Sequence, residues 1–512
     1  MTKVIKFLGS YTKIFLFIIA LVISTLVINK SLFLRWIGYE RIPIPLTDEF
    51  DYAWLGLSLR TNGVPLAWTT YTHIYKDPNL HTRGGNLKGF GITSDGKNIN
   101  LGEFKKDPRP VVAIEEIDYM KGKEHMFFAV PYFEHPPLGS IIYSLGVGKD
   151  ITDFGHVKPD SFRKPALTLA IITAILLFIF LFQLTLNPWI ASLGVIIYST
   201  VPTYLLATRT AFLENAVPPF ILIHLIILYF AIKVYKKDLD RKKLLILLSI
   251  GGLVGGLAVL AKEPAIGFLF GSFILLVINK IPKKNIAIFT IMASLPILGF
   301  ISWGLWLQKD IFLAVFFSNA TRGFFGSIKF ITILESLRFK NYPFDGWWIW
   351  GFISFFLVSI YIKHKQTLYL VIPLFTHLLL LLLLSSPNYP WYTMSMIPFL
   401  AACSALLIWE IYEKPNIATS YAFFFIPFSS SYYWGGIASK IPPNVGQYRL
   451  IFLLFTLLLI VRLFLGKYKV IRYLWFIFLA LLIYRIIILN ERSLLYFIEN
   501  WGNLSIPSPV TF

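Results

Sequence analysis

The chain is poor in charged residues and in cysteine, and both shortages exclude whole classes of protein. Only 14% of its 512 residues are charged, whereas an ordinary soluble domain carries about 25%. Because 56% of the residues are hydrophobic, a soluble fold of this size would be left with too much exposed apolar surface. The single cysteine, Cys403, excludes an intrachain disulfide and a thiolate metal cluster. We therefore predict that lipid surrounds much of the chain.

Apolar runs long enough to cross a bilayer recur along the sequence. A hydrocarbon core of about 30 Å requires roughly 20 apolar residues in a helix. The first run lacks a small-residue cleavage site after it, so we interpret it as an uncleaved span and not as a signal peptide. The pattern predicts an all-α polytopic membrane protein with about 13 transmembrane helices, near residues 14–30, 165–186, 189–206, 216–233, 244–261, 265–279, 285–307, 347–362, 367–384, 393–410, 417–435, 450–466 and 472–490.

The net charge of +20 raises the question of nucleic-acid binding, and the placement of the basic residues answers it. They cluster in short loops between apolar runs, within residues 233–243, 280–284, 363–365 and 467–472. This placement is typical of cytoplasmic loops. It predicts a multi-pass protein of the cytoplasmic membrane whose N-terminus is cytoplasmic, and no nucleic-acid partner.

Two long polar segments then fall outside the cytoplasm, at residues 31–163 and 308–346. The first is rich in Gly, Lys and Asp with short apolar alternations, so we expect short helices and small strands there. Long loops of this kind usually carry function. The predicted divisions of the chain are a tail with the first span (1–30), the first outer loop (31–163), a transmembrane core (164–307), the second outer loop (308–346), the C-terminal helices (347–490) and an outer tail (491–512).

An acidic group opens the first outer loop. Asp48, Glu49 and Asp51 precede an apolar pattern that predicts a helix lying along the membrane surface. Carboxylates are favoured at a helix N-terminus for structural reasons alone, so capping competes with catalysis as their role. Later in the same loop, Glu134 and His135 precede paired prolines that fix an extended turn.

Three further polar groups interrupt apolar sequence at the predicted outer face: Arg209 with Glu214, Lys262 with Glu263, and Tyr389 with Tyr392. Interfacial anchoring, self-neutralisation of an ion pair and an aromatic belt are the structural alternatives. Taken together, however, the outer groups offer carboxylates for a general base and cations for a phosphate leaving group. Ionisable residues at membrane depth are more often functional than not.

These motifs, in this order, resemble the GT-C glycosyltransferases of the protein O-mannosyltransferase and aminoarabinose-transferase superfamily. The string from His135 to Gly139 is the most specific of them, and the resemblance covers residues 14–410. It implies a GT-C fold with an active site in a cavity at the outer face. It also implies a polyprenyl- or dolichyl-phosphate sugar donor and transfer with inversion to a protein, lipid or glycan acceptor.

The resemblance also implies roles for single residues. Asp48 becomes the catalytic base with Glu49 as its neighbour, and Asp51 and Glu134 become supporting acids. Donor phosphate or substrate binding falls to His135, Arg209, Glu214, Lys262, Tyr389 and Tyr392. A divalent cation bridging Asp48 and the donor phosphate would suit the oxygen ligands, and the sequence leaves this cofactor open. Ser140 stands where the mannosyltransferase branch tends to have lysine, so sugar and acceptor stay open as well.

Two other functions handle the same lipid-linked saccharides. A transporter or flippase would use the charges to line a path, but such proteins often contain internal repeats, and none is evident here. A polysaccharide polymerase or ligase would place key basic residues in a later outer loop, as around Arg322, Lys329 and Arg338.

Overall fold

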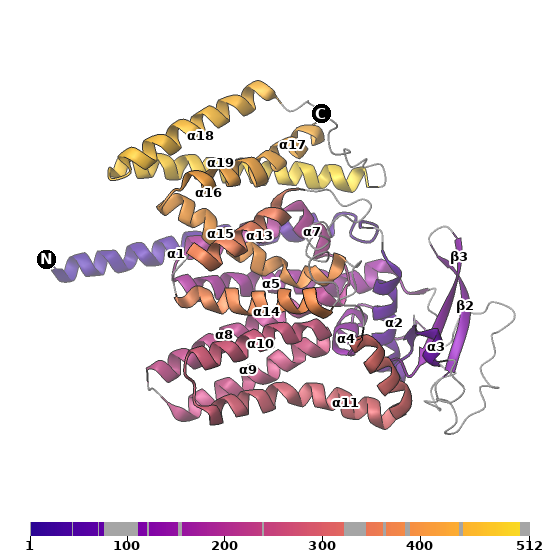
Figure 1. Cartoon of the computed structure of the whole chain (residues 1–512). Coiled ribbons are helices and arrows are strands. Elements are labelled where there is room, and N and C mark those ends of the chain that lie inside the picture. Colours follow the sequence, from indigo (N-terminus) through magenta and orange to yellow (C-terminus); the bar gives the residue numbers. More distant parts are fainter. Residues whose placement is uncertain are drawn as a thin grey trace.

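The computed structural model describes residues 2–43, 45–69, 71–75, 111–119, 122–151, 156–237, 240–321, 345–361, 365–384, 390–439 and 444–501. Long helices lie roughly side by side in a bundle (Figure 1). The hairpin of β2 (Val111–Tyr119) and β3 (Gly122–Val130) lies at the end of the bundle that is remote from the N-terminus. The short helices α2 (Thr47–Asn62) and α4 (Leu138–Ser144) lie at the same end. That end carries the polar groups that the sequence singled out.

Within the described ranges, nine helices are long and apolar enough to cross a membrane. They fall in α1 (Thr2–Trp36), α5 (Pro159–Thr185), α8 (Val217–Lys236), α9 (Arg241–Ala261), α11 (Lys283–Ala320), α14 (Leu368–Leu384), α15 (Ile397–Glu413), α18 (Val445–Leu465) and α19 (Lys469–Glu499). Three shorter helices are also apolar: α6 (Pro188–Thr200), α10 (Ile266–Ile278) and α13 (Trp347–Tyr361).

Every predicted span contains helical structure. The predicted count of 13 transmembrane helices is not reproduced, because only nine of the described helices are long enough to cross a membrane. The segment predicted at 417–435 is broken into α16 (Ile417–Phe423), a π-helical turn (Phe424–Phe428) and α17 (Ser429–Ala438). Pro427 lies inside that turn, and a π-turn is a common way to accommodate a break in a helix. α11 continues past the predicted end at 307, with a kink at Gln308.

The polar end of the bundle is built from short elements. They are α2 (Thr47–Asn62), β1 (Ala67–Trp68), α3 (Thr72–Tyr75), β2 (Val111–Tyr119), β3 (Gly122–Val130), α4 (Leu138–Ser144), α7 (Pro202–Ala207) and the 3-10 turns η4 (Leu213–Ala216), η5 (Glu263–Ala265) and η7 (Pro390–Met396). The 3-10 turn η6 (Lys365–Thr367) lies at the other end, before α14. The strands form an antiparallel sheet in the order β1-β3-β2. The expected small strands and short helices of the first outer loop are therefore present, in a chain that is otherwise helical.

Two glycines let this end pack closely. A Cβ on Gly56 of α2 would lie 2.0 Å from the Ser140 carbonyl oxygen of α4. A Cβ on Gly139 would lie 2.8 Å from the carbonyl oxygen of Ala261, the last residue of α9. Contacts this short exclude a side chain. α4 is thus held between α2 and the end of α9, which brings the turn at His135 next to Lys262.

The predicted orientation can be tested with reporter fusions after residues 40, 240 and 364. Because the loops near 240 and 364 are basic, we expect a cytoplasmic reporter to be active there and an exterior reporter to be active only at 40. An exterior signal at 240 or 364 would contradict the orientation.

Candidate functional site

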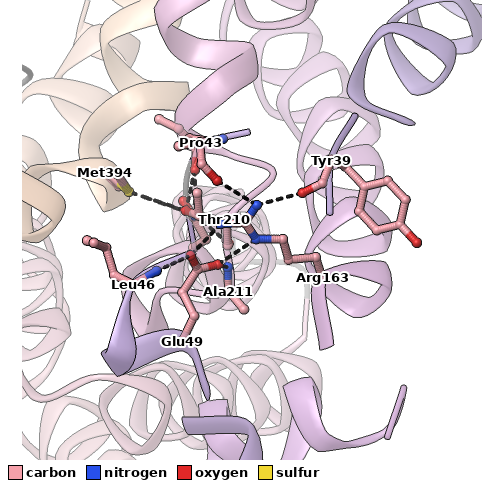
Figure 2. Close-up of polar contacts among 10 residues, drawn as sticks. Tyr39, Pro43, Leu46, Glu49, Arg163, Thr210, Ala211 and Met394 are labelled. Atoms are coloured by element: carbon pink, nitrogen blue, oxygen red, sulfur yellow. Dashed lines mark hydrogen bonds and ion pairs between the residues drawn. The ribbon is translucent and has the colours of Figure 1, made fainter. Parts of the chain in front are cut away.

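Glu49 and Arg163 form an ion pair with no exposed surface on either side chain. The Arg163 Nε donates to Oε2 of Glu49 over 2.8 Å, and its Nη2 donates to Oε1. Figure 2 shows the pair between α2 and the turn that contains Ala211. The remaining capacity of both groups is used by the backbone: Ala211 N and Leu46 N donate to the carboxylate, and Arg163 donates to the carbonyl oxygens of Tyr39 and Pro43.

This pair gives Glu49 a structural role. Its Oε1 lies 3.3 Å from Leu46 N, the helix-capping contact that the sequence suggested as the alternative to catalysis. The carboxylate is enclosed and bonded on both oxygens, so it has no room for a substrate. Glu49 therefore positions the first turn of α2, which carries Asp48.

Lys262 is the charged centre of the site. It follows the last residue of α9, where an extended backbone ends the helix ahead of Pro264. Its ammonium is nearly inaccessible, and its Nζ lies 3.8 Å from Oε1 of Glu214 and 3.6 Å from Oε2 of Glu263. Burial lowers the pKa of Lys262, but the Glu263 and Glu214 charges outweigh it and raise the pKa above its usual value. The side chain is thus a cation held among acids.

His135 joins the same cluster. Its Nδ1 lies 3.0 Å from Oε1 of Glu263 and 3.1 Å from Nζ of Lys262. Because a carboxylate only accepts, the first contact fits an imidazole that carries a proton on Nδ1. The predicted neighbourhood of His135 and Lys262 is therefore present in the structure.

Aromatic rings enclose the ammonium. Nζ of Lys262 lies 5.5 Å from the ring centre of Tyr392 and 6.0 Å from that of Tyr52, within reach of a cation–π attraction. The Tyr52 ring also packs edge to face on His135, with 5.6 Å between centroids. Tyr389, the other predicted tyrosine, lies outside the described residues.

Asp48 faces the same charge. It lies in the first turn of α2 and its side chain is partly buried. Burial raises the pKa of Asp48 to about 6. The Lys262 ammonium lowers this pKa, and the Glu49 charge raises it further. A carboxyl group with this pKa is ionised near neutrality and is a far stronger base than an ordinary aspartate.

The supporting acids bind the sheet to the bundle. Asp51 accepts a hydrogen bond from Trp68 N over 2.6 Å, and burial, with the charges of Glu134 and Asp48 contributing, raises its pKa well above the usual range. The Thr69 hydroxyl donates to Glu134. Both acids therefore hold β1 and the turn before His135 against α2.

Arg209 and Glu214 are both buried but in different surroundings. Arg209 Nη1 donates to the Ile37 carbonyl oxygen, 3.0 Å away, just after the C-terminal end of α1. The carboxylate oxygens of Glu214 have no hydrogen-bond donor among the described residues, and the Lys262 ammonium is the cation beside them. Glu214 thus keeps acceptor capacity toward the cluster, whereas Arg209 is engaged with α1.

Sequence reasoning missed two members of this arrangement. Arg163 stands with Lys164 just before a predicted span, where basic residues resemble interfacial anchors, and it is 114 positions from its partner Glu49. Tyr52 offered a signal, because it follows Asp48 by four residues and so shares its helix face. The apolar pattern of α2 was interpreted only as a surface helix.

No family model and no curated protein matches this chain, but solved structures do. ArnT from Cupriavidus metallidurans, bound to undecaprenyl phosphate, gives a TM-score of 0.51 at 11% identity, covering 93% of this chain and 75% of that one. Its apo state gives 0.52 at the same identity and coverage. The Archaeoglobus fulgidus oligosaccharyltransferase, in complex with Zn and sulfate, gives 0.41 at 12% identity, covering 85% of this chain and 56% of that one.

The ArnT matches confirm the predicted resemblance at the level of the fold. This chain is a multi-pass membrane protein with a GT-C-like fold. An identity of 11% is too low to carry an activity from one protein to the other.

The buried pair makes a prediction about stability. Arg163→Met leaves the Glu49 carboxylate buried without its partner, so the free energy of unfolding should fall by about 3–5 kcal/mol. Chemical unfolding of the purified protein measures it. Lys414→Met, which removes one partner of the exposed pair with Glu410, is the control and should cost less than about 1 kcal/mol. Equal losses in the two variants would contradict the structural role of the pair.

Proposed function

We propose that this protein is a glycosyltransferase that moves a sugar from a polyprenyl-phosphate donor to an acceptor, with inversion, at the extracytoplasmic face of the cytoplasmic membrane. The observation that carries the proposal is that Lys262 lies over the face of α2 that carries Asp48, at one end of a GT-C-like bundle: its Nζ is 6.0 Å from the ring centre of Tyr52, one turn after Asp48, and its charge lowers the pKa of Asp48. One supplies a base and the other a buried cation, and single displacement at a sugar carbon requires both.

In the proposed reaction the acceptor is a hydroxyl or amine. Asp48 takes its proton while the acceptor atom attacks the anomeric carbon from the face opposite the phosphate. The bond between that carbon and the phosphate oxygen breaks, and the electron pair leaves with the lipid phosphate. One base and one stabilised leaving group suffice, so no second carboxylate is needed to flank the bond, unlike in glycoside hydrolases.

Lys262 is the proposed partner of the leaving phosphate. Its ammonium already pairs with Glu214 and Glu263, which keep it protonated and fixed before the donor arrives. His135 and Tyr392 line the same cation and are proposed to orient the donor. We propose that Arg209 contributes less to phosphate binding than Lys262 does, because its guanidinium is bonded to the backbone at the end of α1.

The site is richer in carboxylates than in cations, and a bound phosphate would add negative charge. A divalent cation would offset that charge, and carboxylate oxygens suit it. Among the described residues, no three His, Cys, Asp or Glu side chains form a metal-ligand group. Asp48 and Glu214 are the residues that would hold such an ion together with phosphate oxygens, because Glu214 has unused acceptor capacity.

The base assignment predicts the effect of one substitution. Asp48→Asn keeps the shape of the side chain but cannot take a proton, so transfer from a radiolabelled polyprenyl-phosphate sugar should fall at least 100-fold, with expression and membrane insertion unchanged. Asp160→Asn, an acid in the first turn of α5, is the control and should retain full transfer. Full activity of Asp48→Asn would exclude Asp48 as the base. Retained lipid translocation without any transfer by the wild type would favour the flippase alternative.

The raised pKa of Asp48 predicts a pH dependence. A base works when deprotonated, so kcat/KM should increase with pH up to an apparent pKa of about 6 and then level off. Below that value the rate should fall about tenfold per pH unit. Steady-state transfer assays between pH 4.5 and 8 measure the profile. A rate independent of pH throughout that interval would contradict the role of Asp48.

A further inference from the structure

A cavity of about 290 Å³ lies between α1, α6, α15 and α19. Its lining comes from the first turns of α6, the last turns of α15 and the first half of α19, and includes Trp189, Leu193, Ile408, Tyr412, Phe476 and Ile483. These helix ends are remote from the candidate site, since α2, which carries Asp48, and α4, which packs on the end of α9 next to Lys262, lie at the other end of the bundle (Figure 1). The cavity therefore lies in the half of the bundle that is opposite the candidate site.

The lining is mostly apolar, and two of its polar side chains have partners within the protein. Ser192 accepts from the Ser24 hydroxyl and donates to the Ala20 carbonyl oxygen. Trp409 Nε1 donates to Glu413. The cavity is open on its outer side, because Ala480 and Tyr484 of its lining are exposed. A groove left unfilled would forfeit packing contacts along its wall, so hydrocarbon of the surrounding lipid is the filling that suits it.

Two basic residues lie on the same face of α19 as the cavity lining, nearer the start of the helix. Phe476, Leu479 and Ile483 line the cavity at helical spacing. Arg472 and Lys469 precede Phe476 by four and seven residues, so they lie on the same face, one and two turns nearer the helix start. Both are exposed. The Nε of Arg472 donates to the Gly466 carbonyl oxygen, which fixes the guanidinium at the helix start.

We propose that this surface, the cavity together with Lys469 and Arg472, binds one anionic phospholipid of the leaflet opposite the candidate site. One acyl chain fills the cavity, and the headgroup phosphate pairs with the two basic side chains. Charge complementarity selects the occupant: an apolar cavity accepts any lipid tail, but a pair of cations at the headgroup level selects an anionic lipid. A polyprenyl-phosphate donor bound at Lys262 would carry its phosphate at the other end of the bundle.

The experiment uses the full-length protein, purified in detergent and analysed by native mass spectrometry. Phosphatidylglycerol and phosphatidylcholine with identical acyl chains are added separately. Wild type should retain one phosphatidylglycerol with at least fivefold preference over phosphatidylcholine. Lys469→Ala/Arg472→Ala should lose the preference, because only the headgroup contact changes. Ala480→Phe, which fills the cavity, should reduce retention of both lipids.

Lys283→Ala/Lys284→Ala is the matched control. These exposed lysines start α11 at the same end of the bundle, away from the cavity, and the variant should bind as wild type does. Equal retention of the two lipids by wild type would overturn the proposal. So would an unchanged Ala480→Phe variant, an equal loss in the lysine control, or displacement of phosphatidylglycerol by polyprenyl phosphate at equal concentration.

Discussion

The buried ion pair of Glu49 and Arg163 is the constraint on which the candidate site depends. Two charges removed from water are stable only when every remaining donor and acceptor is satisfied. Here the backbone at Leu46, Ala211 and residues 39–43 completes the pair, so α2, α5 and two loops must meet at one point (Figure 2). Asp48 precedes Glu49 by one residue, and its position follows from that meeting.

The two ends of the bundle also differ in the kinds of side chain that they carry. At one end, α9 ends just before Lys262. Close packing at Gly139 brings His135 into contact with the Lys262 side chain. The acids around Lys262 hold a cation ready at low dielectric, where it acts on a substrate more strongly than it would in water. At the other end, apolar helix faces leave a cavity below exposed basic residues. The two ends therefore differ in how they hold charge: one buries it among acids and tyrosines, and the other exposes it beside apolar helix faces.

The sequence predicted helices better than it predicted side-chain partners. Apolar runs locate spans because lipid imposes length and composition locally, and all 13 predicted ranges contain helical structure. The break at Pro427 was missed because it does not interrupt the hydropathy pattern. The polar residues from Gln308 correctly ended the predicted span, but the helix continues beyond this kink to Ala320. Glu49 could not be separated from Asp48, because the difference is Arg163, 114 residues away. The neighbourhood of His135 and Lys262 came from ordered motifs, since spacing along the chain says nothing of contacts across the bundle.

Transfer of a sugar by the purified protein tests the central claim most directly. The protein would be incubated with a panel of radiolabelled polyprenyl-phosphate sugars and a membrane extract as the source of acceptors, and the labelled product would be identified. We expect one donor to label an acceptor with inverted configuration at the anomeric carbon and to release the unlabelled lipid phosphate. Absence of label transfer from every donor, with lipid binding intact, would contradict a glycosyltransferase and favour a protein that only moves these lipids.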